Sequence, residues 1–454
     1  MKTKKQHGLF VSICLVASGI VGTGIYFNPG RVLTEIEGNV GYALLAWIIA
    51  GLLVFTCVAM FAVLATKYKK LHGTVDYAEE LVGKRYGYLV GWFFCMMYQT
   101  AGFALIARIT AGFIATLFGQ VNHISNPFIP IVTISLMTGV FLMNFFIPKV
   151  PMKFNVVTTI LRVIPIIAMA IVGVIVGLLV GNSVPPVPGT NPVLDTPALS
   201  NFMAALFACV FVFNGWQAAT AFNHEIKDSK RKFPLAMIIG FLSIFVLSIA
   251  YFGGLIAVAD PSNILVNNNN ATYDAFAFLF GGEWAGKLFT IFIITSGVGI
   301  LNLCGMGMSR GLLSVAKRGH GPFQKYFSQV HEKTGTARYS LAFCFLISLV
   351  WFVVLYLSQS GLLPTGFVFT LQDFYNLGFY ALLVPIFILF IIKQKEMHWA
   401  LRFVLPSVAI CAVGILVVSL AIASWIHFLI YIGVFIIIGG IGMIFYRKDA
   451  TSQL

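Results

Sequence analysis

Charged residues are scarce in this sequence. Lys, Arg, Asp and Glu together make up only 10% of the 454 residues, whereas 59% are hydrophobic and the mean hydropathy is +0.93. A soluble domain normally carries about 25% charged residues. This shortage excludes a soluble enzyme and predicts an all-α integral membrane protein.

Clusters of reactive side chains are also missing. Each of the seven cysteines falls in a different apolar stretch, and no Cys-x-x-Cys spacing occurs. We interpret them as packing residues, not disulfides or metal ligands. The eight histidines lie mostly in polar segments and form no catalytic constellation. We therefore expect no catalytic residues, no metal and no cofactor. Repeated pore motifs or charged rings, which would favour a channel, are not evident either.

Long apolar runs dominate instead. Twelve are long enough to cross a hydrocarbon core of about 30 Å, and they follow one another with short loops, which indicates a single domain over residues 1–454. The predicted spans, numbered 1 to 12, are Gly8–Val32, Val40–Thr66, Tyr86–Leu117, Phe128–Ile147, Val156–Val180, Phe202–Phe222, Pro234–Val258, Trp284–Met306, Leu341–Ser358, Phe367–Ile392, Ala400–Ala421 and Trp425–Tyr446.

Basic residues alternate between the loops on the two sides. With the N-terminus placed in the cytoplasm, 25 of the 29 Lys and Arg residues fall on the cytoplasmic side. Only Arg31 and Lys287 fall outside, and Arg108 and Arg162 lie within spans. This bias predicts a multi-pass protein of the plasma membrane with both termini in the cytoplasm. The net charge of +14 thus comes mainly from basic residues in loops on the cytoplasmic side of the lipid bilayer. No nucleic acid partner is expected.

Two spans are interrupted by glycine-containing motifs. Span 1 contains Gly19-Ile20-Val21-Gly22-Thr23-Gly24-Ile25, and span 6 contains Phe211-Val212-Phe213-Asn214-Gly215-Trp216. Clustered glycines weaken a helix and invite the backbone to unwind. Unwound backbone inside a bilayer is tolerated only where protein, water or a ligand satisfies it. Two such breaks in corresponding segments indicate a transporter's substrate site.

The spacing of the two breaks predicts an inverted repeat. The breaks lie five spans apart, and because five is odd the two broken helices cross the membrane in opposite directions. We expect a first repeat over residues 8–182, a second over residues 199–392, and two further spans over residues 399–446.

The two breaks offer opposite chemistry. The outer half of span 1 begins with free N–H groups near Gly22, Thr23 and Gly24, which suit a carboxylate. The first half of span 6 ends near Phe213 with carbonyl groups that suit an ammonium group. Together they fit the zwitterion of an α-amino acid. The alternative is that the glycines only allow close helix packing.

The residues around the breaks limit the class of substrate that the site is expected to accept. Phe211, Asn214 and Trp216 are expected to line the side-chain pocket with residues of spans 3, 8 and 10, although simple packing is the alternative for Phe211. No acidic residue is expected close to either break, whereas a cationic substrate would need a buried counter-charge. This favours small or medium neutral substrates.

Three ionisable residues lie inside spans, where charge is costly. Arg162 lies about two turns into span 5, and its guanidinium could replace a metal cation electrostatically. Arg108 and Asp373 are both predicted in the outer halves of their spans. They could pair as an extracellular gate, or each could extend separately to the membrane surface.

The interrupted motifs resemble those of the amino acid–polyamine–organocation superfamily, specifically its L-type amino acid transporter branch and bacterial amino acid permeases. Gly22-Thr23-Gly24-Ile25 is similar to the Gly-Ser-Gly-Ile/Val element of that family. Phe211 to Trp216 resembles its Phe-x-Tyr-Asp/Asn-Gly-Trp element, and Glu225 to Pro234 resembles the following Glu-x-Lys-Asn-Pro-x-Arg-x-x-Pro loop. The resemblance extends from about Gly8 to Phe323.

The resemblance implies a LeuT-type fold with broken helices 1 and 6 and alternating access. It implies that the amides of Thr23 and Gly24 hold a substrate carboxylate. It also implies that the carbonyls of Ile20, Phe211 and Asn214, beside Gly215 and Trp216, hold the amino group, and that Phe211 closes over the substrate. Arg162 falls where sodium-independent members carry a lysine in place of a sodium ion. Arginine is a departure, because it effectively never loses its proton.

These inferences predict a sodium-independent secondary transporter of neutral L-amino acids, with exchange favoured. A proton-coupled symporter and a cationic amino acid or polyamine carrier are the alternatives within transport, and a non-transporting membrane sensor is the alternative of another class. The sequence does not name the amino acid, the net direction of flux or the host, and it does not say whether a homo-oligomer or an accessory subunit is involved.

Overall fold

All regular elements in the described part of the chain are helices. The computed structural model describes residues 8–68, 73–147, 149–180, 196–267, 269–332, 334–362 and 369–447. The α-helices are α1 Leu9–Ile20, α2 Gly24–Glu35, α3 Val40–Lys67, α4 Thr74–Leu81, α5 Lys84–Phe93, α6 Gln99–Leu117, α7 Phe128–Phe146, α8 Lys149–Ala168, α9 Val174–Val180, α10 Leu199–Val210, α11 Ser229–Val258, α12 Pro261–Asn267, α13 Asn269–Leu279, α14 Glu283–Lys317, α15 Gln324–Phe327, α16 Arg338–Gln359, α17 Leu371–Lys393, α18 Leu405–Ala423 and α19 Trp425–Ile444.

Five shorter segments depart from α-helical geometry. They are the π-helical η1 Phe94–Tyr98, η2 Met169–Gly173 and η5 Ala400–Val404, and the 3₁₀-helical η3 Phe211–Phe213 and η4 Trp216–Glu225. Because η1 and η2 continue directly into neighbouring helices, they are wide turns inside long spans. Such turns often occur at functional sites.

The number of membrane spans agrees with the hydropathy pattern. Within the described residues, 11 helices are long and apolar enough to cross a membrane. The pair α1 and α2, bent by 42° at a short break, raises the number to 12 when it is counted as one span. The protein is therefore a multi-span membrane protein.

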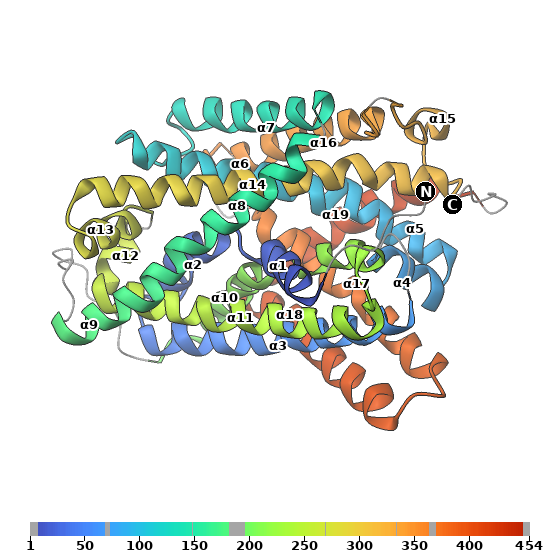
Figure 1. Ribbon diagram of the computed structural model, residues 1–454, viewed down its shortest axis with the longest axis horizontal. Helices are drawn as coiled ribbons and strands as arrows, with labels where there is room; N and C mark the ends of the chain where they lie inside the picture. Colours follow the sequence, from blue (N-terminus) through green and yellow to red (C-terminus); the bar gives the residue numbers. More distant parts are fainter. Residues whose placement is uncertain are drawn as a thin grey trace.

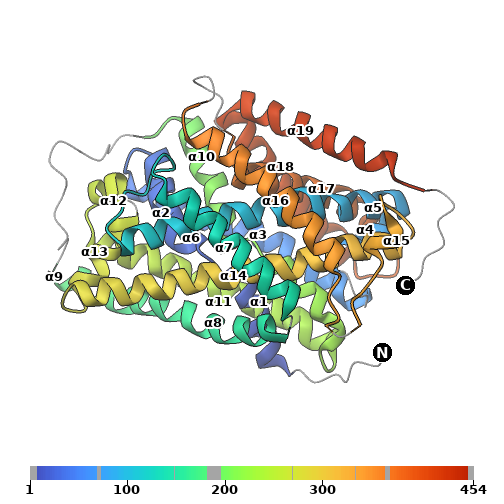
Figure 2. The ribbon, with the colours of Figure 1, turned by 90° about the horizontal axis from the view of Figure 1, so that it is seen from above.

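The long helices run side by side as a bundle (Figure 1). The short helices α12 and α13 lie at one end of the bundle, and α4 and α15 lie at the other, in both views (Figure 2). Loops predicted on opposite sides of the membrane thus lie at opposite ends. Helix α19 runs along the outside of the bundle in Figure 2.

The broken spans lie in the interior of the bundle. Helix α1 packs against α11 and η4, while α10 packs against α3, α18 and α2. Helix α14 packs against α6 on one side and α8 on another. Helices α3, α11 and α18 therefore enclose the broken spans, and α14 packs between α6 and α8.

A buried ion cluster fastens the loop helix α4 to the end of α14. Arg318, which follows the last residue of α14, donates from Nη2 to Asp76 and from Nε to Glu79 Oε2 at 2.9 Å. The Arg318 and Asp76 side chains are only 6% and 5% exposed. A charge this deeply buried is tolerated because it is paired and hydrogen-bonded.

We expect Arg318→Gln to lower the free energy of unfolding by about 3–5 kcal/mol, because it removes the positive charge that pairs with the buried Asp76 carboxylate. The thermal unfolding midpoint of the detergent-solubilised protein measures this loss. Arg310→Gln, at an exposed position of the same helix, is the matched control and should leave the midpoint nearly unchanged. Equal midpoints for the two variants would contradict the role given to this cluster.

Candidate functional site

The first break separates α1 from α2. Helix α1 ends at Ile20, Val21 is extended with ψ 98°, and α2 begins at Gly24. Within the described part of the chain, the N–H groups of Gly22, Thr23 and Gly24 find no backbone acceptor. These donors lie at the start of α2, where a helix carries partial positive charge. The break thus presents unpaired donors in the interior of the bundle.

The second break begins where α10 ends. After the single 3₁₀ turn η3, Asn214 is extended with φ −78° and ψ 164°, and Gly215 has φ +103°. Only glycine adopts that angle without strain. A Cβ on Gly215 would also collide with the carbonyl oxygen of Gly19, and one on Gly19 would lie 2.6 Å from the Gly215 oxygen. The two breaks therefore touch backbone to backbone.

Phe211 lies against the start of α2. A Cβ added to Gly24 would be 2.9 Å from two atoms of the Phe211 ring, so glycine is needed for this approach. The Phe211 ring centroid lies 6.4 Å from that of Tyr375 on α17. The ring is only half-buried, between the donors of the first break and α17. Gly22, two residues earlier, faces Ile300 of α14.

A polar network joins the second break to α17. The side-chain amide of Asn214 donates to Asn376 Oδ1, and the Tyr380 hydroxyl donates to Asn214 Oδ1 at 2.7 Å. The N–H of Gly215 donates to Gln217 Oε1 at 3.0 Å. The Asn214 side chain therefore braces the break against α17.

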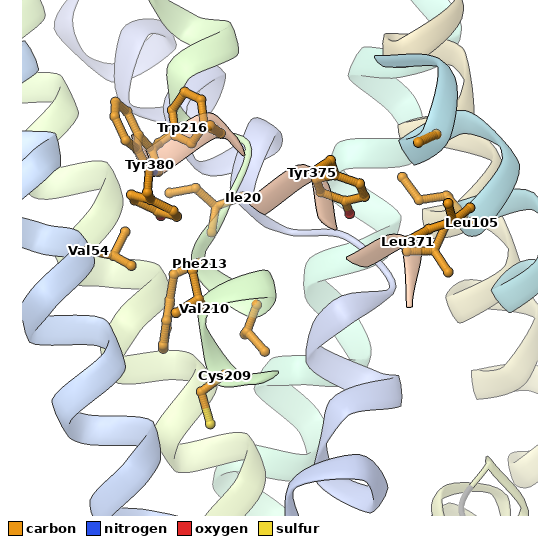
Figure 3. Close-up of a cluster of buried hydrophobic side chains, with 14 of the residues drawn as sticks. Ile20, Val54, Leu105, Cys209, Val210, Phe213, Trp216, Leu371, Tyr375 and Tyr380 are labelled. Atoms are coloured by element: carbon orange, nitrogen blue, oxygen red, sulfur yellow. The ribbon is translucent and has the colours of Figure 1, made fainter. Parts of the chain in front are cut away.

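Trp216 lies in the hydrophobic core beside the second break. Its side chain is fully buried, and its ring meets Phe61 edge-on at 4.9 Å and Phe379 at 5.8 Å. Figure 3 shows Trp216 beside Tyr380, with Ile20 nearby and Tyr375 further along the same cluster. In this structure Trp216 packs against Phe61 and Phe379 beside the second break.

Several residues of the site have no motif in the sequence. Tyr98 accepts a hydrogen bond from Gln217 and ends the π-helical segment η1, whose wide turn only the structure reveals. Asn376 lies three residues after Asp373, so two polar residues stand close together inside an apolar run. This pair was a signal that could have identified the face of α17 that meets the second break.

Arg162 on α8 reaches the first break. Its side chain is fully buried, and Nη1 donates to the carbonyl oxygens of Ser18 at 2.9 Å and Val21 at 3.0 Å. It also donates to the Thr158 carbonyl at 3.2 Å and the Thr158 hydroxyl at 3.1 Å. A Cβ on Gly299 of α14 would lie 2.6 Å from Nη2. A guanidinium thus neutralises the partial negative end of α1 at the point where α1, α8 and α14 meet.

Asp373 does not pair with Arg108, and this corrects the pair considered as an outer gate. Asp373 Oδ2 accepts from Arg31 Nη2 at 2.7 Å, whereas Arg108 Nη1 donates to Asn122 Oδ1 at 2.9 Å. Arg31 lies on α2, which faces α17 across the bundle interior, while Arg108 turns toward the loop that follows α6. The ion pair therefore joins α2, the second half of broken span 1, to α17.

A double-mutant cycle distinguishes the two possible partners of Asp373. We expect Arg31→Gln and Asp373→Asn to be coupled by about 0.5–3 kcal/mol in thermal unfolding, because each removes the same charge-assisted bond. Arg108→Gln serves as the control and should add to Asp373→Asn without coupling. Coupling with Arg108 in place of Arg31 would contradict this assignment.

Comparison with known proteins agrees with these features. Residues 8–446 match the protein-family model described as amino acid permease. The serine/threonine exchanger SteT of Bacillus subtilis (strain 168) is 28% identical over 383 residues, which cover 84% of this chain and 83% of that protein. The b(0,+)-type amino acid transporter 1 of Rattus norvegicus is 24% identical over 447 residues, covering 98% and 87%.

A third relative extends the same pattern. The Asc-type amino acid transporter 1 of Mus musculus is 23% identical over 360 residues, which cover 75% of this chain and 63% of that protein. All three relatives are transporters or exchangers by name, and none is an enzyme. The chain therefore belongs to the amino acid permease family, within the L-type-like branch of the amino acid–polyamine–organocation superfamily, and is a membrane transporter of amino acids.

Proposed function

We propose that this transporter exchanges neutral L-amino acids across the plasma membrane by alternating access and without sodium, with both termini in the cytoplasm. The observation that carries the proposal is the contact between the two breaks. Unpaired N–H groups at the start of α2 lie next to the end of α10, and the half-buried Phe211 ring covers Gly24.

The polarity of the breaks assigns the two ends of the substrate. The amides of Thr23 and Gly24 would hold the carboxylate, because a helix N-terminus offers donors and partial positive charge. The carbonyls of Ile20, Phe211 and Asn214 would hold the ammonium group. Phe211 would close over the bound amino acid and shield these charge-assisted bonds from water.

A neutral side chain fits the charges around the breaks. The acidic residue Asp373 of α17 is engaged by Arg31 at 2.7 Å, so its charge is not free for a cationic substrate. The relative named as a serine/threonine exchanger favours small polar substrates and exchange. We therefore place serine and threonine first among the candidates.

Arg162 supports sodium independence. Its guanidinium donates to the Ser18 and Val21 carbonyls, which are the kind of oxygen ligands that a sodium ion would need. Since arginine stays charged, the same cation is present throughout the transport cycle. This argues against a mechanism driven by its deprotonation.

The arrangement also suits a LeuT-type inverted repeat. The breaks fall at corresponding places in residues 8–182 and 199–392, with residues 399–446 outside the repeats. In this proposal the Arg31–Asp373 pair and Phe211 form the outer gate, and breaking the pair allows α2 to move away from α17.

Uptake into proteoliposomes tests the proposal. We expect saturable uptake of labelled serine that requires internal amino acid, is unchanged when choline replaces sodium, and is inhibited by neutral but not cationic amino acids or polyamines. Uptake that needs a proton gradient would favour a symporter. Strict sodium dependence would overturn the role of Arg162, and binding without any transport would favour a sensor.

A further inference from the structure

A cavity outside the transport site lies at the end of α19. It has a volume of about 260 Å³ and is formed by the turn after α14 and the last residues of the chain that the structure describes. Its lining residues are Gly321, Pro322, Phe323, Ile444, Phe445 and Arg447. By the predicted orientation, this end of α19 meets the cytoplasmic surface of the membrane.

The walls of the cavity are fixed by the backbone. The N–H of Gly321 donates to the carbonyl oxygen of Phe445 at 3.1 Å, which ties the turn to the end of α19. Phe323 has φ +46°, a conformation that is rare for a bulky residue, and its side chain is 68% exposed. Strained backbone that presents an aromatic ring to the surroundings is typical of binding segments.

One arginine lines the cavity, and a second stacks on a residue that is next to the lining in sequence. Arg447 lines it, and the Arg85 guanidinium carbon lies 5.6 Å from the ring centroid of Tyr446, between the lining residues Phe445 and Arg447. Within the described residues, neither arginine forms an ion pair with an acidic side chain. Their charges are therefore available to an anion.

Neighbouring charged residues do not neutralise the charges of these two arginines. Glu79 is already engaged by Arg318 at 2.9 Å. His320 stacks on Tyr446 with the ring centroids 4.6 Å apart. Burial lowers the pKa of His320; Glu79 opposes this effect, and Lys84 and Arg318 add to it. Burial therefore disfavours a positive charge on this histidine, whose ring stacks on Tyr446.

The outer surface of α19 beside the cavity is apolar and exposed, as expected for a surface that faces lipid. Only 17% of the most apolar part of α19 is buried within the protein, and Ile444 is 78% exposed at its end. An apolar surface beside unpaired arginines, at the level where a span ends, matches a molecule with acyl chains and a negatively charged headgroup.

We propose that this cavity binds an anionic phospholipid, with the phosphate facing Arg447 and Arg85 and the acyl chains lying along Ile444 and Phe323. The site is separate from the two breaks and does not depend on the transported substrate. Lipid binding would give a function to the turn after α14, which amino acid transport does not explain.

The experiment titrates the purified full-length protein in a neutral detergent. Phosphatidylglycerol, phosphatidylcholine of the same chain length and inorganic phosphate are added separately, and lipid binding is followed by native mass spectrometry and by the thermal unfolding midpoint. We expect saturable binding and stabilisation with phosphatidylglycerol only. Arg447→Gln and Arg85→Gln should each weaken binding roughly fivefold, because a basic residue at a lipid surface contributes about that factor.

Lys325→Gln is the matched control. It removes one exposed positive charge from α15, two residues after Phe323, without changing the cavity lining, and it should bind phosphatidylglycerol like the parent protein. The proposal is overturned if phosphatidylcholine binds equally well, if inorganic phosphate alone reproduces the stabilisation, or if all three variants lose affinity to the same extent.

Discussion

Replacing Gly24 with leucine is expected to reduce amino acid uptake by roughly 100-fold or more while the protein still inserts into the membrane. A Cβ at this position would lie 2.9 Å from the Phe211 ring, so the larger side chain must displace Phe211 or the start of α2. A displacement of about 1 Å at a positioning site is enough for a loss of that size. Initial rates in proteoliposomes, normalised to the amount of inserted protein, measure the effect.

Gly139→Leu is the matched control for this variant. Gly139 lies on α7 at an exposed position, and nothing lies within 4 Å of where its Cβ would be. The same change in residue type there should leave uptake nearly unaltered. If Gly24→Leu also transported at the parental rate, the start of α2 would not be the carboxylate site.

Replacing Arg162 with alanine is expected to reduce amino acid transport by roughly 100-fold. The change removes at least four hydrogen bonds from a charged donor, and each such bond contributes about 1.5–3 kcal/mol. The loss of two such bonds, at the lower estimate for each, shifts a conformational equilibrium by roughly 100-fold. The buried carbonyls of Ser18 and Val21 would then lack their donor, so the first break would lose its shape.

Arg162→Lys separates the charge from the geometry. A buried lysine can lose its proton, whereas arginine effectively does not. Exchange by Arg162→Lys should therefore be retained at low pH and fall as pH rises, while the parent protein should show no such fall. Arg108→Lys, whose side chain meets Asn122 away from the breaks, is the control. A parental pH profile for Arg162→Lys would contradict the expected loss of charge from a lysine at this position.

The sequence indicated the positions of the breaks because their signals are local. Glycines between Gly19 and Gly24, and again at Gly215, weaken helix formation wherever they occur in an apolar run. The structure interrupts the helix at these same places, at Val21 and at Asn214. The position of Arg162 deep within span 5 was likewise evident from its distance to the span's end.

The partners of the charged residues were not evident from the sequence. Asp373 and Arg108 were both predicted in outer halves of spans, and this placed them at similar depth, yet Asp373 pairs with Arg31. Depth follows from the position of a residue along a helix, but pairing also depends on how each helix is rotated about its own axis. Hydropathy carries little information about rotation in helices that are apolar on all sides.

The amino-acid sequence by itself determined that this protein spans the membrane many times, that two of its spans are interrupted, and that it resembles amino acid transporters. Hydrocarbon imposes these features on the local composition of each segment. Only the tertiary structure decided which backbone groups meet at the breaks, that Asn214 braces α17, and that Arg162 reaches Ser18 and Val21. Those contacts join residues far apart in the chain, so they depend on how the helices pack and how far each side chain extends.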